Sequence, residues 1–276
     1  MDRQPAVAGM FYEGSAPRLE AQVRQCFEQA DLDANATPLP MIGAVVPHAG
    51  LMYSGHVAAK LYGSVSLPRR FIILCPNHTG MGVPVAINSR GGWITPLGRA
   101  QIDAPLADEL MKESTIFTED RAAHSREHSL EVQLPFLQHL SGDEFTFVPL
   151  CMSTPNYQVC VEVGEAIARV VDRRRANGEF IGILSSSDMN HYLDQATTLR
   201  KDQRAIDEIL SLSPSTLWDV VRGEDISMCG IVPTTTMLVA ANKLGATSAT
   251  LLRHATSGDV SGDYDRVVGY AAIVVS

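Results

Sequence analysis

The chain has 276 residues, 45% of them hydrophobic, which is enough to bury a large core. Its 22 basic and 31 acidic residues give a net charge of −9 and form no basic stripe, which argues against nucleic-acid binding. No apolar run approaches the roughly 18 residues of a membrane span, and the start, MDRQPAVAG, lacks the order of a secretory signal. We therefore predict a cytoplasmic protein that binds neither nucleic acid nor membrane.

No linker interrupts the sequence, so we predict one domain over residues 1–276.

Five cysteines occur without any CxxC pair, which predicts free thiols rather than disulfides or a structural zinc site.

Hydrophobic periodicity predicts helices and strands that alternate along most of the chain. The first predicted helix, residues 17–30, places Leu19, Val23 and Cys26 on one stripe. Further helices are predicted over residues 56–64, 105–113, 130–140, 157–175, 196–210, 215–222 and 229–244. Strands are predicted for the apolar runs that begin at Ile42 and Phe71, and over residues 84–88, 92–103, 145–150, 180–184, 247–253 and 267–275. This order predicts an α/β sandwich with a central, mostly parallel or mixed sheet flanked by helices.

Three predicted strands end in a polar cluster that contains a histidine. His48 follows the run IGAVVP, His78 follows FIILCPN, and His191 follows FIGILSSSDMN. Ligands of open α/β sheets bind beyond the carboxyl ends of the strands. The sequence therefore predicts imidazoles gathered at one edge of the sheet.

Two imidazoles and one anionic ligand can hold a divalent metal with positions left open, as in non-haem iron oxygenases and catalytic zinc sites. Asp188, Glu127 and Cys229 are the candidates for the anionic ligand. Cys229 lies before Gly230 at a predicted helix N-terminus, where the helix dipole favours a thiolate. Asp188 could instead orient a histidine or cap a turn. Spacing alone does not rank the three.

A different zinc chemistry is suggested by His124-Ser-Arg-Glu127-His128, which matches the H-x-x-E-H pattern of inverted zinc proteases. That pattern needs both histidines on one continuous helix. Here it lies in a polar stretch before the helix predicted from residue 130, so a zinc-dependent hydrolase is the less favoured alternative.

Seven blocks in order carry a resemblance to a known family: VAGMFYEG, VVPHAGLMYSG, CPNHTG, EHSLEVQLPF, SSDMNHY, CGIVPTTTML and SGDVSGDYDRVVGYAA. They resemble the Memo family, whose prokaryotic members are also called protein B of the AmmeMemoRadiSam system. The resemblance covers residues 3–276. It implies a fold similar to that of class III extradiol dioxygenases, in which two histidines and a glutamate hold Fe(II).

The Memo family is distinguished by a cysteine in place of that glutamate. Carried over by motif, the resemblance implies His48, His78 and Cys229 as metal ligands, with His191 comparable to a dioxygenase acid/base and Asp188 beside it. A thiolate ligand increases the preference of a site for copper and zinc. A dioxygenase activity therefore does not follow from the fold.

The leading hypothesis is a redox-active, metal-binding protein, a candidate oxygenase, with Fe(II) as the first choice of metal and copper or zinc as alternatives. His191 would move a proton, and Asp188 would hold its ring. Tyr53 would line the pocket, and Glu127 and His128 would either support the ligands or cap a helix.

The pocket would take a small-molecule or peptide ligand. The competing hypothesis is a non-catalytic binding or scaffold protein with a vestigial dioxygenase pocket. The system name implies AMMECR1-type and radical SAM proteins as partners under either hypothesis.

Overall fold

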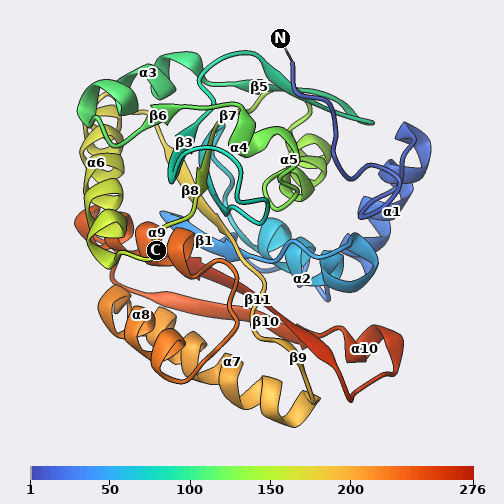
Figure 1. Ribbon diagram of the computed structural model, residues 1–276. Coiled ribbons are helices and arrows are strands. Elements are labelled where there is room, and N and C mark those ends of the chain that lie inside the picture. The colour runs from blue at the N-terminus through green and yellow to red at the C-terminus, as the bar shows by residue number, and fades with distance from the viewer. Residues whose placement is uncertain (1) are drawn as a thin grey trace.

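Four neighbouring parallel strands form the centre of the sheet in the computed structural model, which describes residues 2–276. In spatial order they are β1 (Gly43–Val46), β8 (Ile181–Ser186), β2 (Arg70–Pro76) and β7 (Thr146–Met152) (Figure 1). Almost every residue of these strands is buried, because helices cover both faces of the sheet. Burial on both faces explains why the sequence shows continuous apolar runs there rather than alternation.

Antiparallel strands flank this parallel centre and make the sheet mixed. β11 (Val267–Val275) pairs with β1 and with β10 (Ala249–Thr256), and β3 (Val85–Ile87) pairs with β7. The remaining described strands are β4 (Gly92–Thr95), β5 (Gly98–Ile102), β6 (Thr118–Glu119) and β9 (His191–Leu193).

Helices pack on both faces of the sheet, so the core has two parts. One face carries α3 (Ala104–Glu113), α6 (Tyr157–Ala176), α7 (Gln195–Leu210), α8 (Pro214–Gly223) and α9 (Ile231–Lys243). The other face carries α1 (Ala16–Glu28), α2 (Leu51–Ser64) and α5 (Leu134–Ser141). Short turns of helix lie at α4 (Ala122–Ser125), η1 (Glu131–Gln133) and α10 (Gly258–Ser261).

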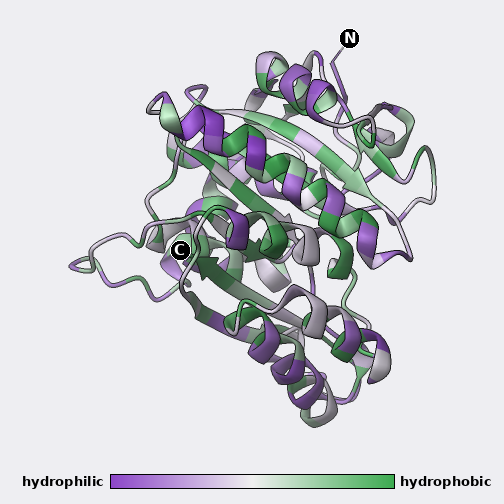
Figure 2. Ribbon diagram, turned by 90° about the vertical axis from the view of Figure 1, so that its left-hand side faces the viewer, coloured by the Kyte–Doolittle hydropathy of each residue, from purple (hydrophilic) through white to green (hydrophobic). Residues whose placement is uncertain are grey.

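Successive strand residues contribute to opposite parts of the core. Val45 and Ile72 belong to the core under α6 and α9, whereas their neighbours Ala44 and Phe71 belong to the core under α1 and α2. In Figure 2 the long helix α6 crosses the view with hydrophilic and hydrophobic residues in alternation, as an amphipathic covering helix should. The predicted α/β sandwich with a mixed sheet is confirmed.

Several boundaries differ from the prediction. Helix α2 begins at Leu51, five residues early, because LMYSG forms its first helical turn although its glycine and serine resemble a loop in sequence. The predicted strand over residues 92–103 is the hairpin of β4 and β5. The predicted helix over residues 130–140 divides into η1 and α5, and Pro135 lies in the first turn of α5. The short strand β9 was not predicted.

Among the described residues, no helix combines the length and the apolar character that crossing a membrane requires.

Candidate metal site

Polar side chains gather where β1, β8 and β2 end side by side. His48 lies two residues beyond β1, Asp188 two residues beyond β8, and His78 two residues beyond β2. The three strands are parallel neighbours, so their carboxyl ends meet at one edge of the sheet. A cavity of about 610 Å³ opens there, and its lining includes His48, His78, His128, Asp188, His191 and Cys229.

Hydrogen bonds fix which nitrogen of His48 is free. The hydroxyl of Ser186 donates its only proton to the carbonyl of Ser129, 2.7 Å away. It therefore acts as an acceptor both for the Gln133 amide at 3.0 Å and for Nδ1 of His48 at 2.9 Å. Nδ1 of His48 must carry the proton, which leaves the lone pair on Nε2. Burial holds the pKa of His48 well below its usual range, so the ring is neutral.

A buried carboxylate orients His78 in the same way. Nδ1 of His78 lies 2.9 Å from Oε1 of Glu127, and the backbone N–H of His78 donates to Oε2. Glu127 also accepts bonds from the N–H and the hydroxyl of Ser129. Burial alone would raise the pKa of Glu127, but these bonds outweigh it and lower the pKa to about 2. Burial lowers the pKa of His78, but the hydrogen bond and the charge of Glu127 outweigh burial and raise it. The carboxylate holds Nδ1, which leaves Nε2 as the nitrogen for a metal, the usual orientation of a metal-binding histidine.

His128 joins these two rings. Three ring nitrogens lie within 4.8 Å of one another, one each from His48, His78 and His128. This spacing is close enough to hold one metal ion. The ring of His128 stacks on that of His78, with 4.8 Å between centroids, and also packs against Phe11 in a tilted arrangement. The sequence suggested His128 only as a supporting residue. Its position directly after Glu127 was the available signal, because a loop that brings Glu127 to His78 also brings its neighbour.

The thiol of Cys229 lies beside His48 but is not part of the group formed by His48, His78 and His128. Its Sγ is 3.3 Å from Nε2 of His48 and accepts the backbone N–H of Asp188 at 3.3 Å. Burial and the nearby Asp188 carboxyl raise the pKa of Cys229 far above its usual range. We expected a thiolate at this helix N-terminus. The structure instead favours the protonated thiol, because the cost of desolvation outweighs the effect of the helix dipole. A bound metal ion would deprotonate a coordinating thiol.

Asp188 and His191 are placed differently from the expectation. Oδ1 of Asp188 accepts the backbone N–H groups of His48 and Ala49, and burial raises the pKa of Asp188 to about 6. The ring of His191 is instead held by Ser227, whose carbonyl accepts Nδ1–H at 2.8 Å. Asp188 thus fixes the backbone that carries His48, and Ser227 fixes His191.

Comparisons with known proteins place nearly the whole chain in one family. Residues 3–274 match the family model described as "Memo-like protein". The chain is 42% identical to the MEMO1 family protein of Methanopyrus kandleri, over 99% of both chains. It is 43% identical to a MEMO1 family protein of Methanosarcina mazei, over 99% of this chain and 98% of the relative.

The chain belongs to the Memo family. Among solved structures, an uncharacterized protein of Escherichia coli K12 shares the fold, with a TM-score of 0.56 and 12% identity over 85% of this chain and 99% of the other.

The walls of the cavity in this Memo-family chain are not those expected. Tyr53, on α2, is not among the described residues that line it. The aromatic lining comes instead from Phe11, in the N-terminal segment, and from Tyr192, next to His191. Phe11 lies far from any predicted strand, so strand-end reasoning could not find it, whereas Tyr192 directly follows the strand-end residue His191.

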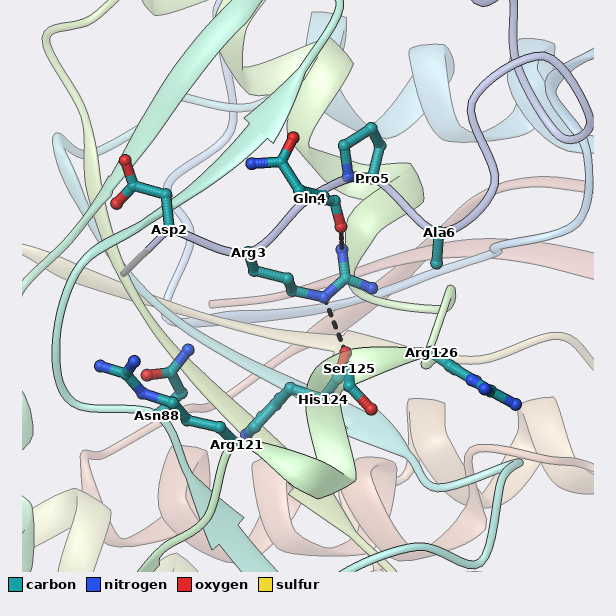
Figure 3. A pocket seen from close by; sticks show the side chains of 10 residues that line it. All are labelled: Asp2, Arg3, Gln4, Pro5, Ala6, Asn88, Arg121, His124, Ser125 and Arg126. Carbon is teal, nitrogen blue, oxygen red and sulfur yellow. Dashed lines mark hydrogen bonds between the residues drawn. The ribbon is translucent and has the colours of Figure 1, made fainter.

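The H-x-x-E-H pattern of this Memo-family chain is divided between two places. His124 is buried on the short α4, donates Nε2–H to the carbonyl of Ala86, and lines a second cavity of about 570 Å³ beside Arg3 (Figure 3). His128 lies in the first cavity, and no continuous helix joins the two residues. The pattern therefore does not supply the paired ligands of an inverted zinc protease.

Proposed function

We propose that this chain holds a redox-active transition metal with His48, His78 and a third ligand, and that it oxidises a small organic substrate. The supporting observation is the convergence of three imidazole nitrogens within 4.8 Å, with the Nδ1 atoms of His48 and His78 committed to Ser186 and Glu127. Two rings that share this orientation have Nε2 as the nitrogen that can coordinate a metal, which requires the neutral imidazole.

Cys229 and His128 are the two candidates for the third ligand. Cys229 lies against Nε2 of His48, and His128 stacks on His78. A set of imidazoles with one thiol fits Fe(II), copper and zinc, and does not suit Mg²⁺ or Ca²⁺, which prefer oxygen. We propose Cys229 as the ligand, because thiolate adds the negative charge that His128 lacks. We propose Fe(II) as the metal, with copper as the redox-active alternative. Zinc fits the same donors, but it has no redox chemistry and would not support oxidation.

The chain's own residues bind substrate and move protons. The bound metal would supply electron transfer and activation of O₂. A cavity of about 610 Å³ matches the size of ordinary small-molecule sites, with Phe11 and Tyr192 as apolar walls. His191 keeps Nε2 free of its Ser227 hydrogen bond, so this nitrogen can accept a proton from substrate.

Anaerobic metal analysis tests the proposal. We expect close to one metal ion per wild-type chain, a strong loss in His48→Ala and a partial loss in Cys229→Ser. O₂ uptake with a catechol probe tests turnover. Stoichiometric metal without O₂ uptake would favour the non-catalytic binding protein, whereas a metal-free wild type that His48→Ala leaves unchanged would refute the metalloprotein altogether.

A further inference from the structure

We propose that Asn190 and Asp202 are positioning residues that determine which nitrogen of His191 faces the cavity. The inference deepens the proposed function and rests on it in one respect, the use of His191 as a base. The hydrogen bonds that carry it involve no metal ligand.

His191 is attached to Ser227 at two points. Its backbone N–H donates to the hydroxyl of Ser227 at 2.8 Å, and its ring Nδ1 lies 2.8 Å from the carbonyl oxygen of Ser227. A carbonyl oxygen can only accept, so Nδ1 carries the proton. In the neutral ring the lone pair is then on Nε2. The position of one carbonyl group therefore decides the tautomer of His191.

Ser227 is an exposed residue and does not hold its own position by burial. Its N–H and its hydroxyl both donate to Oδ1 of Asn190, at 3.2 and 3.1 Å. Asn190 is 1% exposed, and its Nδ2 donates to the buried hydroxyl of Thr198. The backbone N–H of Ser227 can only donate, which fixes the orientation of the amide. A buried side chain thus anchors an exposed loop at the edge of the cavity.

Asp202, on α7, anchors Asn190 in turn. Its fully buried carboxylate accepts the backbone N–H of Asn190 at 2.8 Å and faces Nε2 of His254, on β10, at 2.8 Å. Gly269 on β11 makes room for it, because a Cβ at that position would lie 1.8 Å from an oxygen of Asp202. The backbone N–H of Gly269 also donates to the carbonyl of Asn190. The segment before His191 is therefore attached to both α7 and β11.

The residue after His191 shows that this segment is held under constraint. Tyr192 has a φ of 63°, in the left-handed region that a bulky side chain rarely adopts. Such a conformation costs on the order of 1–3 kcal/mol and persists only where the surroundings fix it. The bonds from Asn190 and Ser227, with the pairing of β9 to β11, supply that constraint.

The test is the ring tautomer of His191, read from long-range ¹H–¹⁵N spectra of the full chain labelled at histidine and treated with a chelator. The His191 signal is assigned with His191→Gln. In the wild type, we expect the neutral ring to be mainly Nδ1–H. In Asn190→Leu, the ratio of Nδ1–H to Nε2–H should fall roughly five- to tenfold, the net effect of one hydrogen bond.

Ser227→Ala is a milder second variant, which removes the hydroxyl that joins His191 to Asn190 and should shift the ratio in the same direction. If Asn190→Leu does not fold, the tautomer ratio of Ser227→Ala provides the test. Ser211→Ala is the matched control, because its exposed hydroxyl makes one bond, to the carbonyl of Glu208, outside this network. A wild-type ring that is mainly Nε2–H, or a ratio that neither folded variant changes, would overturn the proposal. The tautomer ratio tests the positioning of His191, and metal analysis tests the proposed metal site. Either proposal can therefore fail without the other.

Discussion

The Sγ of Cys229 lies 3.3 Å from Nε2 of His48, although 181 positions separate the two residues in the chain. Gly230 makes this approach possible, because a Cβ there would lie 2.3 Å from the side chain of Ser187 at the end of β8. The N–H of Gly230 also donates to the hydroxyl of Ser187. The start of α9 can therefore lie directly against the strand ends that carry the histidines.

This contact predicts that Cys229 becomes a metal ligand. Co(II) added to the wild-type protein should give near-ultraviolet thiolate-to-metal charge-transfer absorption, and Cys229→Ser should lose that band while the protein still binds Co(II) through its histidines. The measurement is an anaerobic absorption titration. His128→Ala is the matched comparison and should keep the band. A wild type that binds Co(II) without this band, and whose binding is weakened by His128→Ala but not by Cys229→Ser, would assign the third ligand to His128.

Glu127 should control metal affinity although it is not a proposed ligand. Glu127→Gln removes the negative charge that accepts Nδ1–H of His78, and we expect metal affinity to fall about 10- to 100-fold. Competition with a chromophoric chelator measures the affinity. Glu144→Gln, at an exposed ion pair with Arg69, is the control and should change nothing. Equal affinities for wild type and Glu127→Gln would show that the carboxylate does not act through His78.

The buried ion pair of Arg3 and Glu131 should make a large contribution to stability. Glu131 also accepts the N–H groups of Ala6 and Val7, so it attaches the N-terminal segment to the loop of Glu127. Arg3→Met leaves a buried carboxylate without its cation, and we expect a loss of about 3–5 kcal/mol in the free energy of unfolding. Urea denaturation measures this loss.

The control for Arg3→Met is Arg24→Met, which removes an exposed ion pair with Glu20. It should cost less than about 0.5 kcal/mol, because exposed pairs of this kind contribute little. Similar losses in both variants would mean that the N-terminal segment is not held by Glu131.

His124 should make the protein less stable in mild acid. Burial lowers the pKa of His124 from 6.5 to about 4, and nearby Arg3 adds to this effect. Between these pH values the unfolded chain binds the proton and the folded chain does not, so stability falls as the pH falls from about 6.5 to about 4. The contribution of His124 is a loss of about 2 kcal/mol on going from pH 7 to pH 5.

Urea denaturation at the two pH values, on wild type and on His124→Gln, isolates this contribution. The variant should lose less stability between pH 7 and pH 5 than the wild type does. An identical pH dependence in both proteins would contradict a buried, neutral His124.

The sequence by itself was enough to predict the mixed α/β sandwich and to locate His48, His78 and Asp188 beyond buried strands. Both inferences depend on local patterns. A run of apolar residues identifies a strand covered on both faces, and parallel neighbours necessarily end at one edge of the sheet. The family resemblance added Cys229, which the local pattern could not rank above Asp188 or Glu127.

Only the tertiary structure decided the contacts between loops. Glu127 bonds to His78 across 49 residues, His128 stacks on the same ring, and Ser227 rather than Asp188 holds His191. The side chains of these loops follow no helical or strand periodicity that the sequence could reveal. Their partners depend on how distant segments pack around a buried carboxylate or amide, so that each polar group is satisfied.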